Sequence, residues 1–323
     1  MNLPSKKDLT ICFAHPAYQL SAVFAERETG INHFQVWNRE SVAERLPEAD
    51  VLVTSGFWNN GLFKAAPNLR FVQSVSAGID QYDQALFRAR GARLASAAGV
   101  NANAVAQHAL ALILSFARLL HTGRDNQHRQ LYRGMISDPA QREDELGGKT
   151  ILIVGLGRIG RRLAQLAKAF EMHVIATKRT PERDTGVADA VYPPSELPNL
   201  LPQADYVVLT CPLTPATENL IDAQALAAMR PDAYLINVAR GRVVNEPALI
   251  ASLQAGQLAG AGLDCTWEEP LPSSSPLWAM ENVIITPHSA GETRQYEAKV
   301  IDILLENLER LWRGETQLVN EVV

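Results

Sequence analysis

Cysteine, basic charge and long apolar runs are all scarce in this sequence of 323 residues. The three cysteines, Cys12, Cys211 and Cys265, lie in separate apolar stretches and form no Cys-X-X-Cys pair. They offer neither a disulfide framework nor a cysteine metal site, and a reducing, cytoplasmic setting fits. Thirty Lys and Arg stand against 35 Asp and Glu, a net charge of −5, so a nucleic-acid surface built on net basicity is not expected.

No stretch of the sequence has the roughly 20 consecutive apolar residues that cross a bilayer. The most apolar segment, residues 104–120, is interrupted by four polar side chains, and we predict a buried helix there. The N-terminus carries Lys6 and Lys7 without the following apolar run that a signal peptide needs, so export is not supported. We therefore expect neither a membrane nor a nucleic acid among the partners.

The length suggests two domains, since a typical domain has about 150 residues. Short apolar runs alternate with helical patterns along the chain, which is typical of parallel sheets with helices on both faces. The strands that we predict for a first α/β unit are residues 9–13, 51–54, 71–75 and 93–95. Those for a second unit are residues 151–154, 173–176, 206–210, 234–238, 260–264 and 283–286. The last helical pattern, residues 292–312, has no strand after it and is expected to pack on the first unit.

A glycine-rich turn links the first strand of the second unit to a helix. The turn consists of Gly155, Leu156, Gly157, Arg158, Ile159 and Gly160. Between a strand and a helix, the early glycines allow a tight turn and let a pyrophosphate approach backbone amides at the helix N-terminus. We predict a dinucleotide site here; the alternative is a glycine-rich turn without a ligand.

The next strand of the second unit lacks the acidic residue that usually binds the adenosine ribose. It ends instead in Lys178, Arg179 and Thr180. A carboxylate would repel a 2′-phosphate, whereas Lys and Arg pair with it. We therefore expect NADP(H) to be preferred, with NAD(H) possible; the alternative is a solvated basic turn.

Three charged residues follow three later strands of the second unit: Arg240, Glu269 and His288. Ligands of open α/β sheets lie beyond the carboxyl ends of the strands. A histidine can protonate the oxygen of a 2-oxo acid as its carbonyl is reduced, a glutamate beside it favours the imidazolium, and an arginine can hold the substrate carboxylate. Taken singly, each has an ordinary alternative: a surface ion pair, a solvated turn or a packed histidine.

In order and spacing, these motifs resemble the D-isomer-specific 2-hydroxyacid dehydrogenase family over nearly the whole chain. The motifs are the glycine-rich turn, residues 237–241, residues 263–270 and residues 286–288. The resemblance implies that Arg240 binds and orients the substrate, that Glu269 favours the protonated form of His288, and that His288 is the general acid in reduction and the base in oxidation. It also implies further cofactor contacts at Cys211, Pro212, Val238, Ala239 and Asp264. Glu269 argues against formate dehydrogenase, whose similar site pairs its histidine with glutamine.

The resemblance implies two Rossmann-like, doubly wound parallel-sheet domains of the α/β class, the first discontinuous. Residues 1–102 plus 292–323 would form the substrate domain, and residues 103–291 the dinucleotide-binding domain, with the active site in the cleft between them. The backbone amides of Ser76, Ala77 and Gly78 would bind the substrate carboxylate; the alternative is an ordinary strand-to-helix turn. Trp58 either shapes the substrate pocket or caps the core, and Trp267 is another possible wall.

Residues 123–148 resemble the arm through which family members dimerise, so a homodimer is expected. We expect reduction of a small 2-oxo acid such as glyoxylate or hydroxypyruvate, with no metal. The alternatives are a dinucleotide-sensing, corepressor-like protein, and a dehydrogenase of a dedicated biosynthetic hydroxy acid. Gln107 stands where relatives usually carry Glu, and we expect a packing role for it and for His108.

Overall fold

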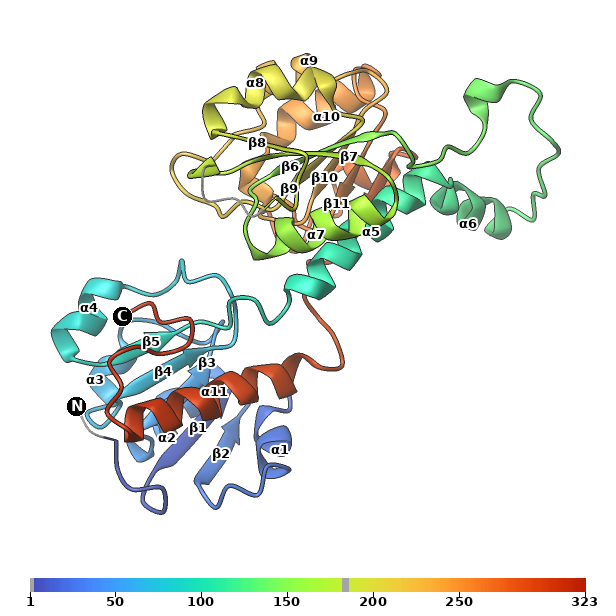
Figure 1. Ribbon diagram of the computed structural model, residues 1–323. Coiled ribbons are helices and arrows are strands. Elements are labelled where there is room, and N and C mark those ends of the chain that lie inside the picture. The colour runs from blue at the N-terminus through green and yellow to red at the C-terminus, as the bar shows by residue number, and fades with distance from the viewer. Residues whose placement is uncertain (1–2, 182–185) are drawn as a thin grey trace. The chain divides into compact units, whose positions relative to one another are not determined.

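The computed structural model describes residues 3–181 and 186–323, and the chain divides into two compact units (Figure 1). Unit 1 consists of Met1–Asn101 and Thr293–Val323, and unit 2 consists of Ala102–Glu292. These boundaries lie one residue from those expected from the sequence.

Unit 1 is built on a five-stranded parallel sheet with strand order β2-β1-β3-β4-β5. Its strands are β1 (Thr10–Ala14), β2 (Asn32–Val36), β3 (Val51–Thr54), β4 (Phe71–Ser74) and β5 (Arg93–Ala95). Its helices are α1 (Leu20–Ala25), α2 (Arg39–Arg45), α3 (Leu62–Ala65), α4 (Gln84–Arg90) and α11 (Tyr296–Trp312). The sequence pattern does not predict β2, because this edge strand is only partly buried and carries polar residues among its apolar ones.

The long C-terminal helix α11 belongs to the core of unit 1. Its buried Val300, Leu304 and Leu308 pack in one cluster with Leu9 and Phe13. The chain then returns along β5, where the amide of Leu94 donates to the carbonyl of Val323 at 2.9 Å. The N-terminal and C-terminal parts of the chain, although far apart in the sequence, thus form one α/β unit.

Unit 2 is built on a seven-stranded sheet with order β12-β11-β10-β9-β6-β7-β8, in which every pairing is parallel. Its strands are β6 (Thr150–Val154), β7 (His173–Thr177), β8 (Ala190–Tyr192), β9 (Tyr206–Leu209), β10 (Tyr234–Asn237), β11 (Gly260–Leu263) and β12 (Val283–Ile285). Its helices are α5 (Ala102–Ala117), α6 (Leu120–His128), α7 (Arg158–Ala169), α8 (Leu197–Leu200), α9 (Ala223–Ala228) and α10 (Glu246–Gln254). The fold class is therefore as predicted, although β8, a short and incompletely buried edge strand, was not foreseen.

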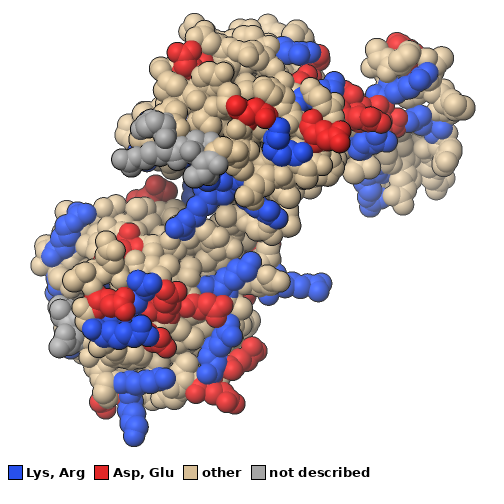
Figure 2. Space-filling view, viewed as in Figure 1, with Lys and Arg blue, Asp and Glu red and all other residues tan. Residues whose placement is uncertain are grey.

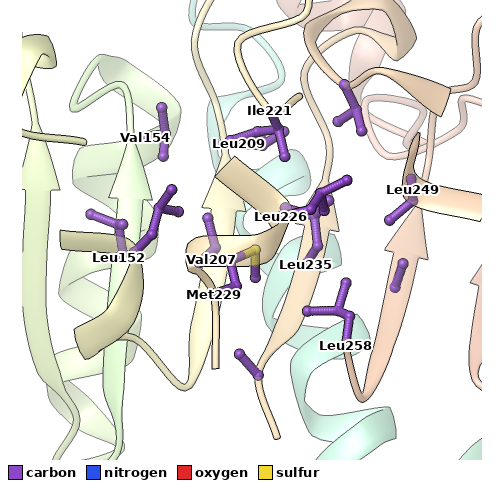
Figure 3. Close-up of a cluster of buried hydrophobic side chains, with 14 of the residues drawn as sticks. Leu152, Val154, Val207, Leu209, Ile221, Leu226, Met229, Leu235, Leu249 and Leu258 are labelled. Atoms are coloured by element: carbon purple, nitrogen blue, oxygen red, sulfur yellow. The ribbon is translucent and has the colours of Figure 1, made fainter. Parts of the chain in front are cut away.

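Both faces of the unit 2 sheet are buried, which explains the nearly continuous apolar strands in the sequence. Leu152, Val207 and Leu235 point to one face, where α9 and α10 cover them (Figure 3). Ile151 and Ile153 alternate with them and pack on the other face, in a cluster that includes residues of α5 and α7. The helices cover the two faces of the sheet, and loops follow the carboxyl ends of its strands.

Helix α6 and residues 129–143 extend away from the sheet of their own unit (Figure 1). We call residues 120–143 the arm. Helix α6 occupies the first part of the arm. The arm exposes Leu131, Tyr132 and Met135, the last two completely.

Among the described residues, no single helix is long and apolar enough to cross a membrane; only α5 and α6, which meet at a 67° bend, satisfy that test together, by length and composition. Eight residues of α5 are buried in the unit, as expected for a core helix. Basic and acidic side chains are interspersed on the face of each unit seen in Figure 2, in keeping with the balanced composition.

Candidate active site

The glycine-rich turn between β6 and α7 is shaped by two glycines that no other residue can replace. Gly155 has φ +104°, and a Cβ there would lie 2.8 Å from the Cα of Cys211. A Cβ on Gly160 would lie 2.5 Å from the carbonyl oxygen of Gly155. A Cβ on Gly157, by contrast, would meet no atom within 4 Å. The protein's own packing requires the first and third glycines, and the middle one leaves open space beside the backbone.

Helix α7 presents an uncapped N-terminus at this turn. Its N-cap is Gly157, no side chain caps it, and its first turn contains no acidic residue. The amides of Ile159 and Gly160 make no hydrogen bond within the described residues. Such free amides, together with the positive end of the helix dipole, suit a phosphate group.

The end of β7 lies directly against the glycine-rich turn. The carbonyl of Thr177 accepts hydrogen bonds from the amides of Gly155 and Leu156, at 3.2 and 2.9 Å. Lys178, Arg179 and Thr180 follow at once, and residues 177–181 contain no Asp or Glu. The two cations therefore begin where the backbone of β7 touches the turn.

The loop after β9 forms the opposite wall of the turn. The hydroxyl of Thr210 donates to the carbonyl of Gly155 at 2.7 Å, and Cys211 lies against that glycine. Burial raises the pKa of the Cys211 thiol to about 11, so this cysteine is protonated at neutral pH. Pro212 follows and is exposed. Cys211 has the position expected of a packing residue beside a cofactor, with no nucleophilic character.

Asn237, at the end of β10, fixes the loop that carries Arg240. Its side-chain oxygen accepts from the amide of Ala239 at 3.0 Å, and its side-chain nitrogen donates to the carbonyl of Arg240 at 3.0 Å. Val238 and Ala239 are consequently buried, each with 7% of its surface exposed. The role of Asn237 was not predicted from the sequence, although an asparagine at a strand end is a common loop-shaping residue.

The loop after β10 touches the loop after β11 at Gly241. A Cβ on Gly241 would lie 1.9 Å from the carbonyl oxygen of Thr266 and 2.6 Å from the amide nitrogen of Trp267. Thr266 in turn donates its amide to Oε1 of Glu269 at 3.2 Å. Arg240 and Glu269 are therefore held on two loops in direct backbone contact.

Glu269 and His288 form a hydrogen-bonded pair at the rim of the sheet. Nδ1 of His288 lies 2.8 Å from Oε2 of Glu269, and the two side chains are 43% and 39% exposed. Because a carboxylate only accepts, Nδ1 carries the proton of this bond. Nε2 of His288 makes no hydrogen bond within the described residues. The outer face of the imidazole is thus available to another molecule.

A cavity of about 540 Å³ adjoins this pair. Thr266 and Glu269 line it on the polar side, and Leu271, Trp278 and Pro287 contribute apolar surface. The site therefore combines a titratable pair with an apolar neighbourhood, as small-molecule sites generally do.

Asp264 follows β11 and is almost completely buried, with 2% of its surface exposed. Its Oδ1 accepts from the hydroxyl of Thr286 at 2.6 Å and from the amides of Ser289 and Ala290 at 3.0 and 3.2 Å. This carboxylate ties the end of β11 to the loop that carries His288. The cofactor contact expected of Asp264 would have to use Oδ2, which, among the described residues, accepts only from Ala290, at 3.1 Å.

In unit 1, the residues 76–78 lie in the turn that follows β4. The amide of Ser76 donates to the hydroxyl of Ser74 at 3.2 Å, and its carbonyl accepts from Ala97. The amides of Ala77 and Gly78 make no hydrogen bond within the described residues. Two of the three amides expected to bind an anion are therefore available, and the third is already used.

Trp58 was expected either to shape the substrate pocket or to cap the core, and its packing in the structure is that of a core residue. Its ring is 6% exposed and lies within 5.5 Å, centroid to centroid, of those of Phe63, Tyr82 and Phe87. Expecting it in a substrate pocket gave too much weight to its loop position, because four aromatic rings bury one another here. Trp267 is 39% exposed, and its indole nitrogen donates to the carbonyl of Val244 at 2.5 Å.

Comparison with known proteins agrees with this geometry. Residues 110–290 match the family model described as "D-isomer specific 2-hydroxyacid dehydrogenase, NAD binding domain". A glyoxylate reductase of Pyrococcus furiosus is 36% identical over 321 residues, which span 92% of this chain and 93% of that protein.

Two solved structures are similar over almost the whole chain. A D-isomer specific 2-hydroxyacid dehydrogenase family protein from Aeromonas salmonicida is 29% identical, with a TM-score of 0.84, over 98% of this chain and 99% of that one. An acyclic imino acid reductase in complex with NADPH and D-Arg is 25% identical, with a TM-score of 0.84, over 98% and 100%. The chain belongs to the D-isomer-specific 2-hydroxyacid dehydrogenase family, and it is an oxidoreductase with a nicotinamide dinucleotide-binding domain.

Proposed function

We propose that this enzyme reduces a small 2-oxo acid, with glyoxylate or hydroxypyruvate as the first substrates to test, and that it prefers NADPH. The observation that carries the proposal is the pair of Glu269 and His288, whose free Nε2 stands at the carboxyl edge of the dinucleotide-binding sheet. The names of relatives such as the Pyrococcus furiosus glyoxylate reductase support the substrate class.

A nicotinamide dinucleotide, when bound, would supply the hydride, and the protein's own residues would supply the proton and bind the substrate. As hydride reaches the carbonyl carbon, negative charge develops on the oxygen, and Nε2 of His288 donates a proton to it. Glu269 accepts the hydrogen bond from Nδ1 and fixes the ring orientation, which leaves Nε2 for the substrate. In the oxidative direction the neutral imidazole accepts the proton at the same nitrogen.

Arg240 is the residue that we assign to the substrate carboxylate. Its guanidinium can make two parallel hydrogen bonds to a carboxylate, which a lysine cannot. The protein uses one donor, Nη1, on the carbonyl of Ala239 at 2.7 Å, which fixes the guanidinium in place. The amides of residues 76–78 are proposed as further donors to the same carboxylate group.

The preference for NADPH rests on Lys178, Arg179 and Thr180. They begin where Thr177 bonds to the glycine-rich turn, at the place where an acidic residue would bind the ribose hydroxyls. A 2′-phosphate bound there would gain charge-assisted hydrogen bonds. The open space at Gly157 and the uncapped N-terminus of α7 support a pyrophosphate beside them.

The test is a panel of initial rates with glyoxylate, hydroxypyruvate, pyruvate and phenylpyruvate, each with NADPH and with NADH. We expect glyoxylate or hydroxypyruvate with NADPH to give the highest kcat/KM. Arg179→Asp is expected to raise the KM for NADPH at least tenfold and to spare that for NADH, and Lys64→Asp, at an exposed position of α3, is the matched control. A clear preference of the unaltered enzyme for NADH would refute the cofactor assignment, and NADPH binding without any turnover would favour the sensing function instead.

We also propose that the arm forms a homodimer. It exposes Leu131, Tyr132 and Met135, and exposed apolar surface of this kind marks an interaction site. Light scattering at micromolar concentration is expected to give twice the chain mass, and Tyr132→Asp is expected to weaken the dimer. A monomer at that concentration would refute the assignment. The buried, unpaired cysteines support the cytoplasmic location expected from the sequence.

A further inference from the structure

A chain of hydrogen bonds connects the core helix α5 to the loop that carries His288. Nε2 of His108, on α5, lies 2.9 Å from the hydroxyl oxygen of Thr286. That hydroxyl donates to Oδ1 of Asp264 at 2.6 Å, and the same oxygen accepts from the amides of Ser289 and Ala290. The sequence predicts a packing role for His108, and in the structure its ring also makes a directed polar contact with the loop.

The direction of this chain follows from counting protons. A threonine hydroxyl has one hydrogen, and here it points to Asp264. Nε2 of His108 must then be the donor to Thr286, so the neutral ring carries its proton on Nε2. The direct distance from that nitrogen to Oδ1 of Asp264 is 3.6 Å, which is too long for a hydrogen bond but close enough for attraction.

The loop needs such support because His288 has an unusual backbone. Its φ is +54°, a left-handed conformation that non-glycine residues adopt only where the surroundings hold them. The amides that directly follow it, those of Ser289 and Ala290, are bound by Asp264. Any change that frees the Asp264 carboxylate therefore loosens the backbone on which the imidazole stands.

We propose that His108 is a positioning residue, which orients Thr286 and Asp264 and thereby holds His288 in its working direction. The hydrogen bond from His108 makes the Thr286 hydroxyl a stronger donor to Asp264, because linked hydrogen bonds polarise one another. It also fixes the rotamer of Thr286. The effect on catalysis rests on the proposed function of His288. The effect on the loop backbone does not, and this separates the two in an experiment.

The direct test is hydrogen exchange, measured by mass spectrometry on peptides that cover residues 286–292. His108→Met removes the donor and keeps an apolar side chain, whereas His108→Gln places an amide NH₂ near the position of Nε2. We expect faster exchange at Ser289 and Ala290 in the methionine variant and near-normal exchange in the glutamine variant. Gln107→Met, at the exposed neighbour on the same helix, is the matched control and is expected to leave the loop unchanged.

The kinetic test uses the whole enzyme and asks whether His108 acts through Thr286. His108→Met is expected to lower kcat by roughly 3- to 10-fold at unchanged KM for the dinucleotide, since one hydrogen bond is lost. Thr286→Val is expected to lower kcat by at least the same factor. Thr286→Ser, which keeps the hydroxyl, is expected to keep the kcat of the unaltered enzyme. If His108 acts through Thr286, the double variant His108→Met/Thr286→Val is no slower than Thr286→Val alone.

The outcomes distinguish the inference from the proposed function. Unchanged exchange in His108→Met, or fully additive losses in the double variant, would overturn the role of His108. Faster exchange of the loop in an enzyme that reduces none of the 2-oxo acids would uphold the positioning of the loop and overturn the proposed function. Equal effects of His108→Met and His108→Gln would mean that ring volume matters and hydrogen bonding does not, which also overturns the inference.

Discussion

Replacing Gly241 by alanine gives the most direct test of the active-site geometry. The added Cβ would lie 1.9 Å from the carbonyl oxygen of Thr266, and real Cβ contacts essentially never fall below 3.0 Å. One of the two loops must therefore retreat by about 1 Å, and the obstructing atoms are backbone, which cannot rotate away. Arg240 precedes the glycine, and Thr266 holds Glu269 through its amide.

The expected loss can be estimated from this displacement. A misplacement of about 1 Å costs on the order of 100-fold in rate when it separates groups that act together. Overpacking in a well-packed region costs about 1–3 kcal/mol of folding free energy, which lowers the Tm of a domain of this size by a few degrees. We expect Gly241→Ala to reduce kcat/KM far more than it reduces stability.

The assay combines initial rates of 2-oxo acid reduction with a thermal melt followed by circular dichroism. Gly123→Ala is the control, since a Cβ there meets no atom within 4 Å and the residue lies in the exposed helix α6. Gly123→Ala should keep the rate, and its Tm should not fall, because alanine is more favourable than glycine in a helix interior. If Gly241→Ala retained the kcat/KM and the Tm of the unaltered enzyme, the contact between the two loops would not exist as described.

The other predictions concern the general acid, the residue that binds the substrate carboxylate, the pyrophosphate site and the cysteine thiols. His288→Ala removes the proton donor and should lower kcat by roughly 10²- to 10⁴-fold in steady-state assays; a surviving rate would refute the assignment. Arg240→Lys keeps the charge but loses the planar fork, so kcat/KM for the 2-oxo acid should fall by at least tenfold, and no change would mean that Arg240 does not bind the carboxylate. Gly157→Ala should leave the Tm unchanged, because its Cβ meets open space, and should raise the KM for NADPH, because that space is needed for the pyrophosphate. Burial raises the pKa of Cys12 to about 12 and that of Cys211 to about 11, and it also raises the pKa of Cys265. At pH 9, a thiol-alkylating reagent should therefore modify these three cysteines only after the protein is denatured. Rapid labelling of the native protein would contradict this.

The sequence was sufficient where chemistry is local. A glycine pattern between an apolar strand and a helix depends on neighbours in the chain, and so do charged residues in the loops that follow Asn237 and Leu263. They predicted a parallel α/β fold, a dinucleotide site and the trio of Arg240, Glu269 and His288. Edge strands such as β2 and β8 were missed because their burial is partial, and strand periodicity reports burial.

The tertiary structure decided everything that depends on contacts between distant segments. Trp58 could line a pocket or fill a core by sequence alone, and only the three rings that surround it decide for the core. Gly241 is indispensable because Thr266, from another loop, occupies the space of its missing side chain. His108 finds Thr286 across 178 positions of the chain. Hydrophobic period and turn chemistry are written in adjacent residues, whereas close packing and hydrogen-bond partnership arise only when the sheet brings its loops together.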